Sequence, residues 1–148
     1  DMNPAKEIAL ALADDVPVVW GGSVLAARAA RRVAEALRAA CGRPAIAGID
    51  SQLVPLLERA PEPDVFADPY EEGVPVSRPS LLVLDDGAES PTIRLGRDRV
   101  LGAAERSAVR VHEVRAVEGP DVGRFAALLA TGRFAAAYLA LGLGRPAG

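Results

Sequence analysis

The sequence has very little of several residue types that mark particular classes of protein. Its 148 residues include one cysteine, Cys41, so the chain cannot form an internal disulfide, and a reducing cytoplasmic location is expected. Lys6 is the only lysine, which leaves almost no candidate for Schiff-base chemistry. No apolar run of about 18 residues is free of charge, which argues against a membrane span. The first residues also lack the cationic and apolar regions of a signal peptide.

What the sequence does contain is the composition of an ordinary globular domain. Half of its residues are hydrophobic and 25% are charged, so one domain with its own core is expected across residues 1–148. The formal net charge of -3 comes from 17 basic and 20 acidic residues spread along the chain. Because no stretch forms a basic footprint, nucleic acid is not an expected partner.

Short apolar segments alternate with segments of helical periodicity along the chain. Strands are predicted at residues 16–20, 44–49, 80–86 and 109–117. Helices are predicted at residues 5–14, 23–40, 51–60, 97–108, 119–131 and 132–144, the last two being separated near Thr131-Gly132. This alternation is typical of βαβ units, and it predicts an α/β sandwich whose parallel sheet is covered by helices on both faces.

Individual residues mark where these elements begin and end. Asn3 is a plausible N-cap for the first helix, and Gly42 a plausible stop for the second. Residues 61–79 contain five prolines and predict a long irregular connection. Phe66 and Tyr70 are expected to anchor this connection to the core.

The most informative local element is the segment Gly21-Gly22-Ser23, between the first strand and the long second helix. Paired glycines allow backbone amides to face outward, and a helix N-terminus favours an anion such as a phosphate. The alternative is that the glycines only make a tight turn in which Ser23 caps the helix, and the sequence leaves both open. Neither a GxGxxG nor a GxxxxGK[ST] motif occurs, so a dinucleotide or Walker-type nucleotide site is not predicted, and no cofactor is expected.

Other reactive side chains are few and scattered. The only histidine, His112, and the only cysteine, Cys41, cannot assemble a usual zinc site, so no metal site is predicted. His112 shares a strand face with Arg110 and is expected to be structural or solvent-facing, and Cys41 is expected to be buried. The acidic cluster of Asp85, Asp86 and Glu89 could support acid–base chemistry or hold magnesium, but solvation is the favoured interpretation.

Two long segments carry a family resemblance. NPAKEIALALADDVPVVWGGSVLAARAARR at the start and GRFAALLATGRFAAAYLALGLGRP at the end resemble the second half of bifunctional phosphoglucose/phosphomannose isomerases, members of the sugar isomerase (SIS) superfamily. The resemblance implies a SIS-type three-layer αβα sandwich with a mainly parallel sheet of about five strands. It also implies that the chain is the C-terminal half of a two-SIS-domain protein, with the N-terminal SIS domain and a second copy in a homodimer as partners.

The same resemblance implies interconversion of aldose and ketose 6-phosphates by ring opening and proton transfer through an enediolate. Of the family's motif residues, Arg32 matches the arginine of the long helix, and with Gly21, Gly22 and Ser23 it forms the predicted phosphosugar-binding set. The family's lysine position is occupied by Ala34, and its His-Asn-Glu motif is absent, so no catalytic residue is assigned.

Three carboxylates, Asp50, Glu58 and Glu71, are the nearby candidates for proton transfer, but none lies in a matching motif. Three functions follow as hypotheses. The chain is part of a phosphosugar isomerase, or it is a non-catalytic SIS domain for phosphosugar sensing or dimerisation. The third and least favoured hypothesis is an unrelated α/β binding module. The apolar circumference of residues 123–144 predicts a further packing partner for this helix, unless the domain's own core buries it.

Overall fold

The computed structural model describes residues 3–66, 68, 70, 73 and 77–145, which form alternating helices and strands. In chain order the elements are α1 (Pro4–Ala11), β1 (Val16–Gly21), α2 (Val24–Cys41), β2 (Ile46–Ala47), α3 (Asp50–Glu58), β3 (Pro79–Asp85), α4 (Pro91–Arg106), β4 (Val111–Arg115) and α5 (Asp121–Gly142). The four strands form one parallel sheet in the order β2-β1-β3-β4. The predicted α/β class is therefore confirmed.

The two central strands explain why the sequence shows continuous apolar runs. β1 and β3 pair over six residues, from Val16 opposite Pro79 to Gly21 opposite Leu84. Alternate residues of a strand point to opposite faces of the sheet, so a strand covered on both sides needs apolar residues at every position. Val18 and Trp20 accordingly face one side, whereas Val19 faces the other.

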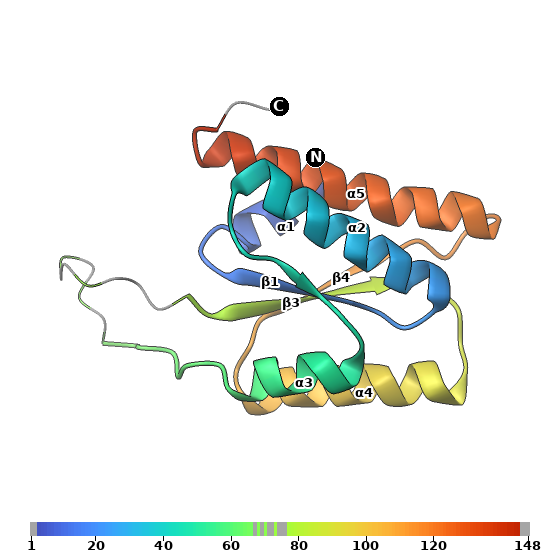
Figure 1. The fold of residues 1–148 in the computed structure, drawn as a ribbon, viewed down its shortest axis with the longest axis horizontal. Helices are drawn as coiled ribbons and strands as arrows, with labels where there is room; N and C mark the ends of the chain where they lie inside the picture. Colours follow the sequence, from blue (N-terminus) through green and yellow to red (C-terminus); the bar gives the residue numbers. More distant parts are fainter. Residues whose placement is uncertain (1–2, 67, 69, 71–72, 74–76, 146–148) are drawn as a thin grey trace.

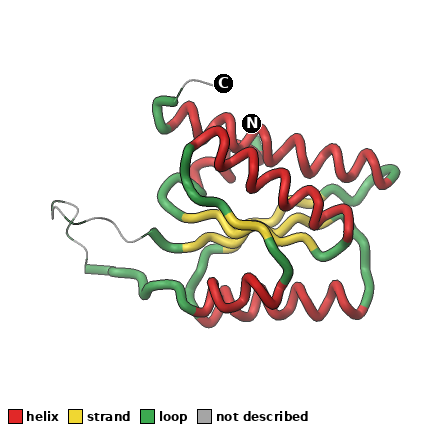
Figure 2. The backbone as a smooth tube through the Cα atoms, in the orientation of Figure 1, coloured by secondary structure: helices red, strands yellow, loops and turns green. Residues whose placement is uncertain are grey.

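Helices cover both faces of the sheet and create two separate cores (Figure 1). α1, α2 and α5 cover one face, with Val33, Leu37 and Leu128 packed on the sheet residues Val19 and Leu82. α3 and α4 cover the other face, where Leu53, Leu57 and Val100 pack on Val18, Trp20 and Val83. Figure 2 shows the resulting three layers of helix, strand and helix. All pairings in the described part of the sheet are parallel, and β2 and β4 are its two edge strands.

Several predicted boundaries are confirmed by local hydrogen bonds. The Asn3 side chain accepts from the Ala5 amide as the N-cap of α1. Gly42 ends α2 with a φ of 62°, a left-handed conformation that favours glycine. Cys41 is buried beneath α5, as expected.

Other expectations were wrong in instructive ways. The described sheet has four strands rather than five, and α4 begins at Pro91, six residues before its predicted start. α5 is a single helix that passes through Thr131-Gly132 without a break. Phe66 and Tyr70 do not anchor their connection, because both side chains are almost fully exposed.

α5 also has the length and mean hydropathy of a membrane span, the only helix among the described residues to do so. This is weak evidence for insertion, because core helices of soluble proteins pass the same test. One third of the apolar window is buried within the domain, and the helix packs along α1 and α2. The arrangement is that of a covering helix in a three-layer sandwich.

Candidate functional site

The sheet order points to one place where a ligand would bind. The chain passes from β1 to β2 on one side and then to β3 on the other, so the direction of winding reverses between β1 and β3. In open parallel sheets, ligands bind outside the carboxyl ends of the strands at such a switch point. At the carboxyl ends of these two strands lie Gly21, Gly22 and Ser23, where β1 ends, and Asp85 and Asp86, where β3 ends. We call these five residues the switch-point site.

The two glycines are required by close contacts at this site. A Cβ on Gly21 would lie 2.3 Å from the carbonyl carbon and oxygen of Ala26, inside the first turns of α2. A Cβ on Gly22 would lie 2.7 Å from the side chains of Ile93 and Trp20. Any larger residue would therefore push α2 away from the sheet or displace α4.

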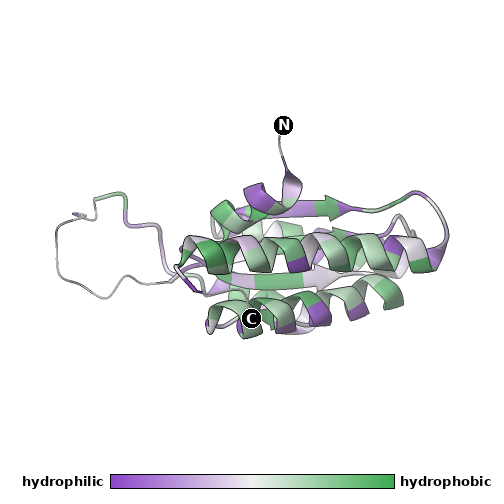
Figure 3. Ribbon diagram, turned by 90° about the horizontal axis from the view of Figure 1, so that it is seen from above, coloured by the Kyte–Doolittle hydropathy of each residue, from purple (hydrophilic) through white to green (hydrophobic). Residues whose placement is uncertain are grey.

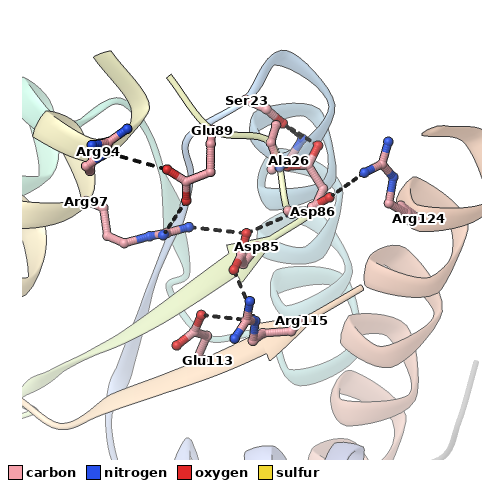
Figure 4. Close-up of polar contacts among 12 residues, drawn as sticks. Ser23, Ala26, Asp85, Asp86, Glu89, Arg94, Arg97, Glu113, Arg115 and Arg124 are labelled. Atoms are coloured by element: carbon pink, nitrogen blue, oxygen red, sulfur yellow. Dashed lines mark hydrogen bonds and ion pairs between the residues drawn. The ribbon is translucent and has the colours of Figure 1, made fainter. Parts of the chain in front are cut away.

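Ser23 has two roles in the structure. Its hydroxyl oxygen accepts a hydrogen bond of 2.9 Å from the Ala26 amide, which confirms it as the N-cap of α2. The same hydroxyl donates to the Asp86 carboxylate over 2.6 Å (Figure 4). A negatively charged group of the chain itself therefore lies beside the helix N-terminus, at the place where an external anion was predicted.

The aspartates of the site are not solvated, so the favoured interpretation of the acidic cluster was wrong for two of its three members. Asp85 is 5% exposed and Asp86 is 6% exposed, whereas Glu89 is exposed. Asp85 forms ion pairs of 3.2 Å with Arg97 from α4 and with Arg115 from β4. Charged carboxylates can remain buried here because guanidinium groups and backbone amides surround them.

Further arginines complete a mixed-charge network at this edge of the sheet (Figure 4). Arg124 from α5 donates to the main-chain oxygen of Asp86 over 3.0 Å, and Arg97 also pairs with Glu89 over 3.4 Å. The Nε atoms of Arg97 and Arg124 are buried and have no hydrogen-bond partner among the described residues. Sequence reasoning missed these arginines, since they come from three elements and no spacing pattern connects them.

Arg32, the fourth predicted binding residue, lies away from the other three. It is nine residues beyond Ser23 on α2, or about 13 Å along the helix axis. Its guanidinium is exposed and pairs with Glu35 over 3.0 Å. With Arg28, Arg31 and Phe125 it lines a separate open hollow of about 540 Å³ between α2 and α5. The structure thus groups Gly21, Gly22 and Ser23 but not Arg32.

The candidates for proton transfer also separate in space. Asp50 begins α3 after the carboxyl end of β2 and pairs with Arg99 over 3.1 Å. Glu58 lies at the opposite end of α3 and pairs with Arg106 over 2.8 Å. Glu71 lies outside the described residues. Asp50 is therefore the described candidate nearest to the carboxyl edge of the sheet.

His112 lies in the middle of β4, beside the helices of the α1, α2 and α5 layer. Its Nε2 atom is buried without a hydrogen-bond partner in the described part of the chain. Burial, with a smaller effect from Arg110, lowers the pKa of His112 below its ordinary value, so the neutral imidazole is favoured. No group of three or more histidine, cysteine, aspartate or glutamate side chains within the described residues is arranged to hold a metal ion.

Comparison with solved structures supports the fold. The chain is similar to a glucose-6-phosphate isomerase like protein from Thermus thermophilus, with a TM-score of 0.67 and 19% identity over 97% of this chain and 42% of that one. It is also similar to a putative sugar binding protein from Salmonella typhimurium, with a TM-score of 0.67 and 12% identity over 100% of this chain and 46% of that one. The chain thus spans less than half the length of either structure.

Comparison of sequences gives the family. No curated protein matches the chain. The model of the bacterial phospho-glucose isomerase C-terminal SIS domain matches residues 1–146, which is nearly the whole sequence. This coverage, together with the parallel sheet and its helical layers, shows that the chain belongs to the family of bacterial phosphoglucose isomerase C-terminal SIS domains.

Proposed function

We propose that the chain is the C-terminal SIS half of a two-domain cytoplasmic protein that binds a sugar 6-phosphate and interconverts its aldose and ketose forms. One observation carries this proposal. The turn Gly21-Gly22-Ser23 lies at the switch point, directly before the 18-residue helix α2, and neither glycine can be replaced without a clash. The first amides of a helix have no partner within it, and its dipole favours a phosphate at this end.

The charges of the switch-point site support binding of a sugar phosphate when groups from outside this chain supply further contacts to the ligand. The guanidinium groups of Arg97 and Arg115 compensate the charge of Asp85, and Arg124 brings a third cation to the main-chain oxygen of Asp86. The site is therefore not a simple acidic barrier. Isomerisation further needs a base within hydrogen-bond reach of the sugar's C1 and C2. The proposal assigns this base to the other half or to a second copy in a homodimer, with Asp50 as the nearest described member of this chain's three predicted candidates for proton transfer.

A second candidate is a SIS domain that lacks isomerase activity. The observation that favours it is the 2.6 Å hydrogen bond between Ser23 and Asp86, because this carboxylate occupies the serine hydroxyl that a phosphate would use. Such a domain would sense a sugar phosphate or stabilise a dimer. The two candidates differ in turnover, so one set of measurements separates them.

The test uses the complete polypeptide that contains this chain. Binding of fructose 6-phosphate and glucose 6-phosphate is measured by calorimetry, and their interconversion is assayed in the same samples. Ser23→Ala is compared with Ala39→Gly, a change at an exposed position near the other end of α2 that costs a similar ~1 kcal/mol of stability. Only Ser23→Ala should weaken binding, since Ala39 lies about 24 Å along the helix axis from Ser23 and is not part of the switch-point site.

The outcomes are distinct. Binding with turnover, weakened only by Ser23→Ala, is the expected result. Binding without turnover would favour the non-catalytic alternative. Absence of binding, or an equal loss of affinity in both variants, would contradict a phosphate site at the switch point.

A further inference from the structure

An apolar groove lies between α1 and the end of α5, far from the switch-point site. It has a volume of about 490 Å³. Leu10 and Ala13 line it from the α1 side, and Tyr138, Leu141 and Leu143 line it from the α5 side. Lys6 is the only charged residue that lines it. Leu10 is 76% exposed and Leu141 is 60% exposed, so the domain itself leaves these side chains uncovered.

The apolar surface extends beyond the groove along α5. Phe134, Tyr138 and Leu141 follow one another at i, i+4 and i+7, a spacing that places them on one face of the helix. Phe134 is 62% exposed, whereas Leu128 and Ala135, which lie about 100–120° around the helix from it, are buried in the core shared with α2. Figure 3, which looks onto this layer of helices, shows apolar residues on the outer surface. Contiguous exposed apolar surface of this kind marks an interaction site.

The place where the polypeptide enters the domain suggests what covers this surface. Asn3, the first residue that the structure describes, donates a hydrogen bond of 3.3 Å to the hydroxyl of Tyr138, at the rim of the groove. Any residues that precede Asn3 therefore start next to the groove. The two similar solved structures are more than twice as long as this chain, which covers 42% and 46% of them.

The size of the surface favours a tethered partner over a free one. A stable interface between separate molecules buries about 800 Å² on each partner. The exposed parts of four or five side chains offer on the order of 400 Å², the size of an ordinary apolar patch. A partner joined through the same polypeptide has an effective concentration in the millimolar range, so a smaller interface is sufficient.

We propose that the groove between α1 and α5, defined by Leu10, Tyr138, Leu141 and Leu143, is the docking surface for the domain that precedes this one in the same polypeptide. The inference rests on the two-domain part of the proposed function. It adds the location of the contact and its apolar character. α1 packs on this domain through Ile8 and Ala9, and the exposed Leu10 is the side chain that it would present to the preceding domain.

Thiol labelling in the complete polypeptide tests this surface. Leu141→Cys places a thiol in the groove, and Val122→Cys is the matched control on the same helix, where the side chain is 79% exposed and about 28 Å away along the axis. The native Cys41 is buried and should remain unlabelled. A maleimide reagent is applied to the folded proteins over about a thousandfold range of protein concentration, and mass spectrometry of peptides locates the label. Thermal melts check that both variants fold.

The expected result is labelling of Leu141→Cys at least about tenfold slower than that of Val122→Cys at every protein concentration. Equal rates would show an open groove and overturn the proposal. Protection that disappears on dilution would also overturn it, because a second copy would then be the occupant. The sugar phosphate measurements remain independent: protection without ligand binding would leave the interface standing while the proposed function fails, and the reverse pattern would reject only the interface.

Discussion

The contact between α2 and α5 yields a quantitative prediction at Gly132. This glycine lies within α5 and is buried against α2. A Cβ at this position would lie 2.3 Å from Cγ2 and 2.8 Å from Cγ1 of Val33, which itself is fully buried. We therefore expect Gly132→Ala to destabilise the domain, although alanine is the better helix former.

Two opposing effects determine the magnitude. Replacement of glycine by alanine inside a helix stabilises it by about 1 kcal/mol. Insertion of a methyl group into a packed core costs about 1–3 kcal/mol, and Val33 cannot relieve the clash by rotation because a β-branched residue in a helix has one preferred rotamer. Overpacking should win, with a net loss of up to about 2 kcal/mol in the free energy of unfolding.

Urea denaturation followed by circular dichroism measures this loss. The matched control is Gly123→Ala in the first turn of the same helix, where a Cβ meets only Pro120 at an ordinary 3.6 Å. This variant should be as stable as the native protein or slightly more stable. The double variant Gly132→Ala with Val33→Ala should be more stable than the sum of the single effects predicts, by about 1–3 kcal/mol. If Gly132→Ala proved as stable as Gly123→Ala, the reasoning about the close helix contact would be refuted.

Three other predictions concern charged and reactive groups. Asp85→Asn should reduce the free energy of unfolding by about 3 kcal/mol, since it leaves the half-buried Arg97 without its main partner. Arg115→Met changes an exposed residue and should cost less than about 1 kcal/mol. Chemical denaturation of both variants checks this order, and equal losses would contradict it. Because burial lowers the pKa of His112, the unfolded chain binds a proton before the folded one as the pH falls, and the stability of the domain should decrease below pH 6.5. The NMR titration of this sole imidazole should have its midpoint below 6.5. A midpoint at 6.5 or above would show that the side chain is solvated. Burial also raises the pKa of the Cys41 thiol, so an aromatic disulfide reagent should react with it only in the unfolded protein, and rapid reaction of the native protein would show that the thiol is accessible.

Much of the fold could be predicted from local chemistry. The run from Val16 to Trp20 is continuously apolar, as a strand covered on both faces must be, and the structure places it in the centre of the sheet. Asn3 and Gly42 were identified because capping depends on a residue's own side chain or backbone freedom. Such features need no knowledge of distant contacts.

The errors arose where a residue has more than one use. Glycine ends many helices, so Thr131-Gly132 was interpreted as a break, whereas Gly132 permits the close approach of α5 to Val33. Phe66 and Tyr70 are the predicted anchors of the long connection, yet both side chains lie exposed on it. Tertiary packing determines the role of each of these residues, and a local sequence pattern carries no information about that packing.

Only the part of the candidate site at the end of β1 could be predicted from the sequence. The segment Gly21-Gly22-Ser23 is recognisable because it directly joins a strand to a helix. The burial of Asp85 was not recognisable, since its partners Arg97 and Arg115 come from α4 and β4, and neither stands at a diagnostic spacing from it. A pair of carboxylates after a strand therefore resembles a solvated loop until the fold brings the arginines to it.

α5 connects the two surfaces to which function is assigned. Its first turns bring Arg124 to the backbone of Asp86 at the switch-point site, and its last turns place Leu141 in the apolar groove. The contact of Gly132 with Val33 fixes the middle of the helix on α2, so the two ends cannot move independently without disturbing the core. A domain that docks in the groove would thereby have a rigid connection to the site about 25 Å away along the helix axis. Asp86 already accepts the hydroxyl hydrogen bond of Ser23, so a phosphate bound as we propose would need additional donors from outside this chain, and a preceding domain held in the groove would supply them from a fixed position.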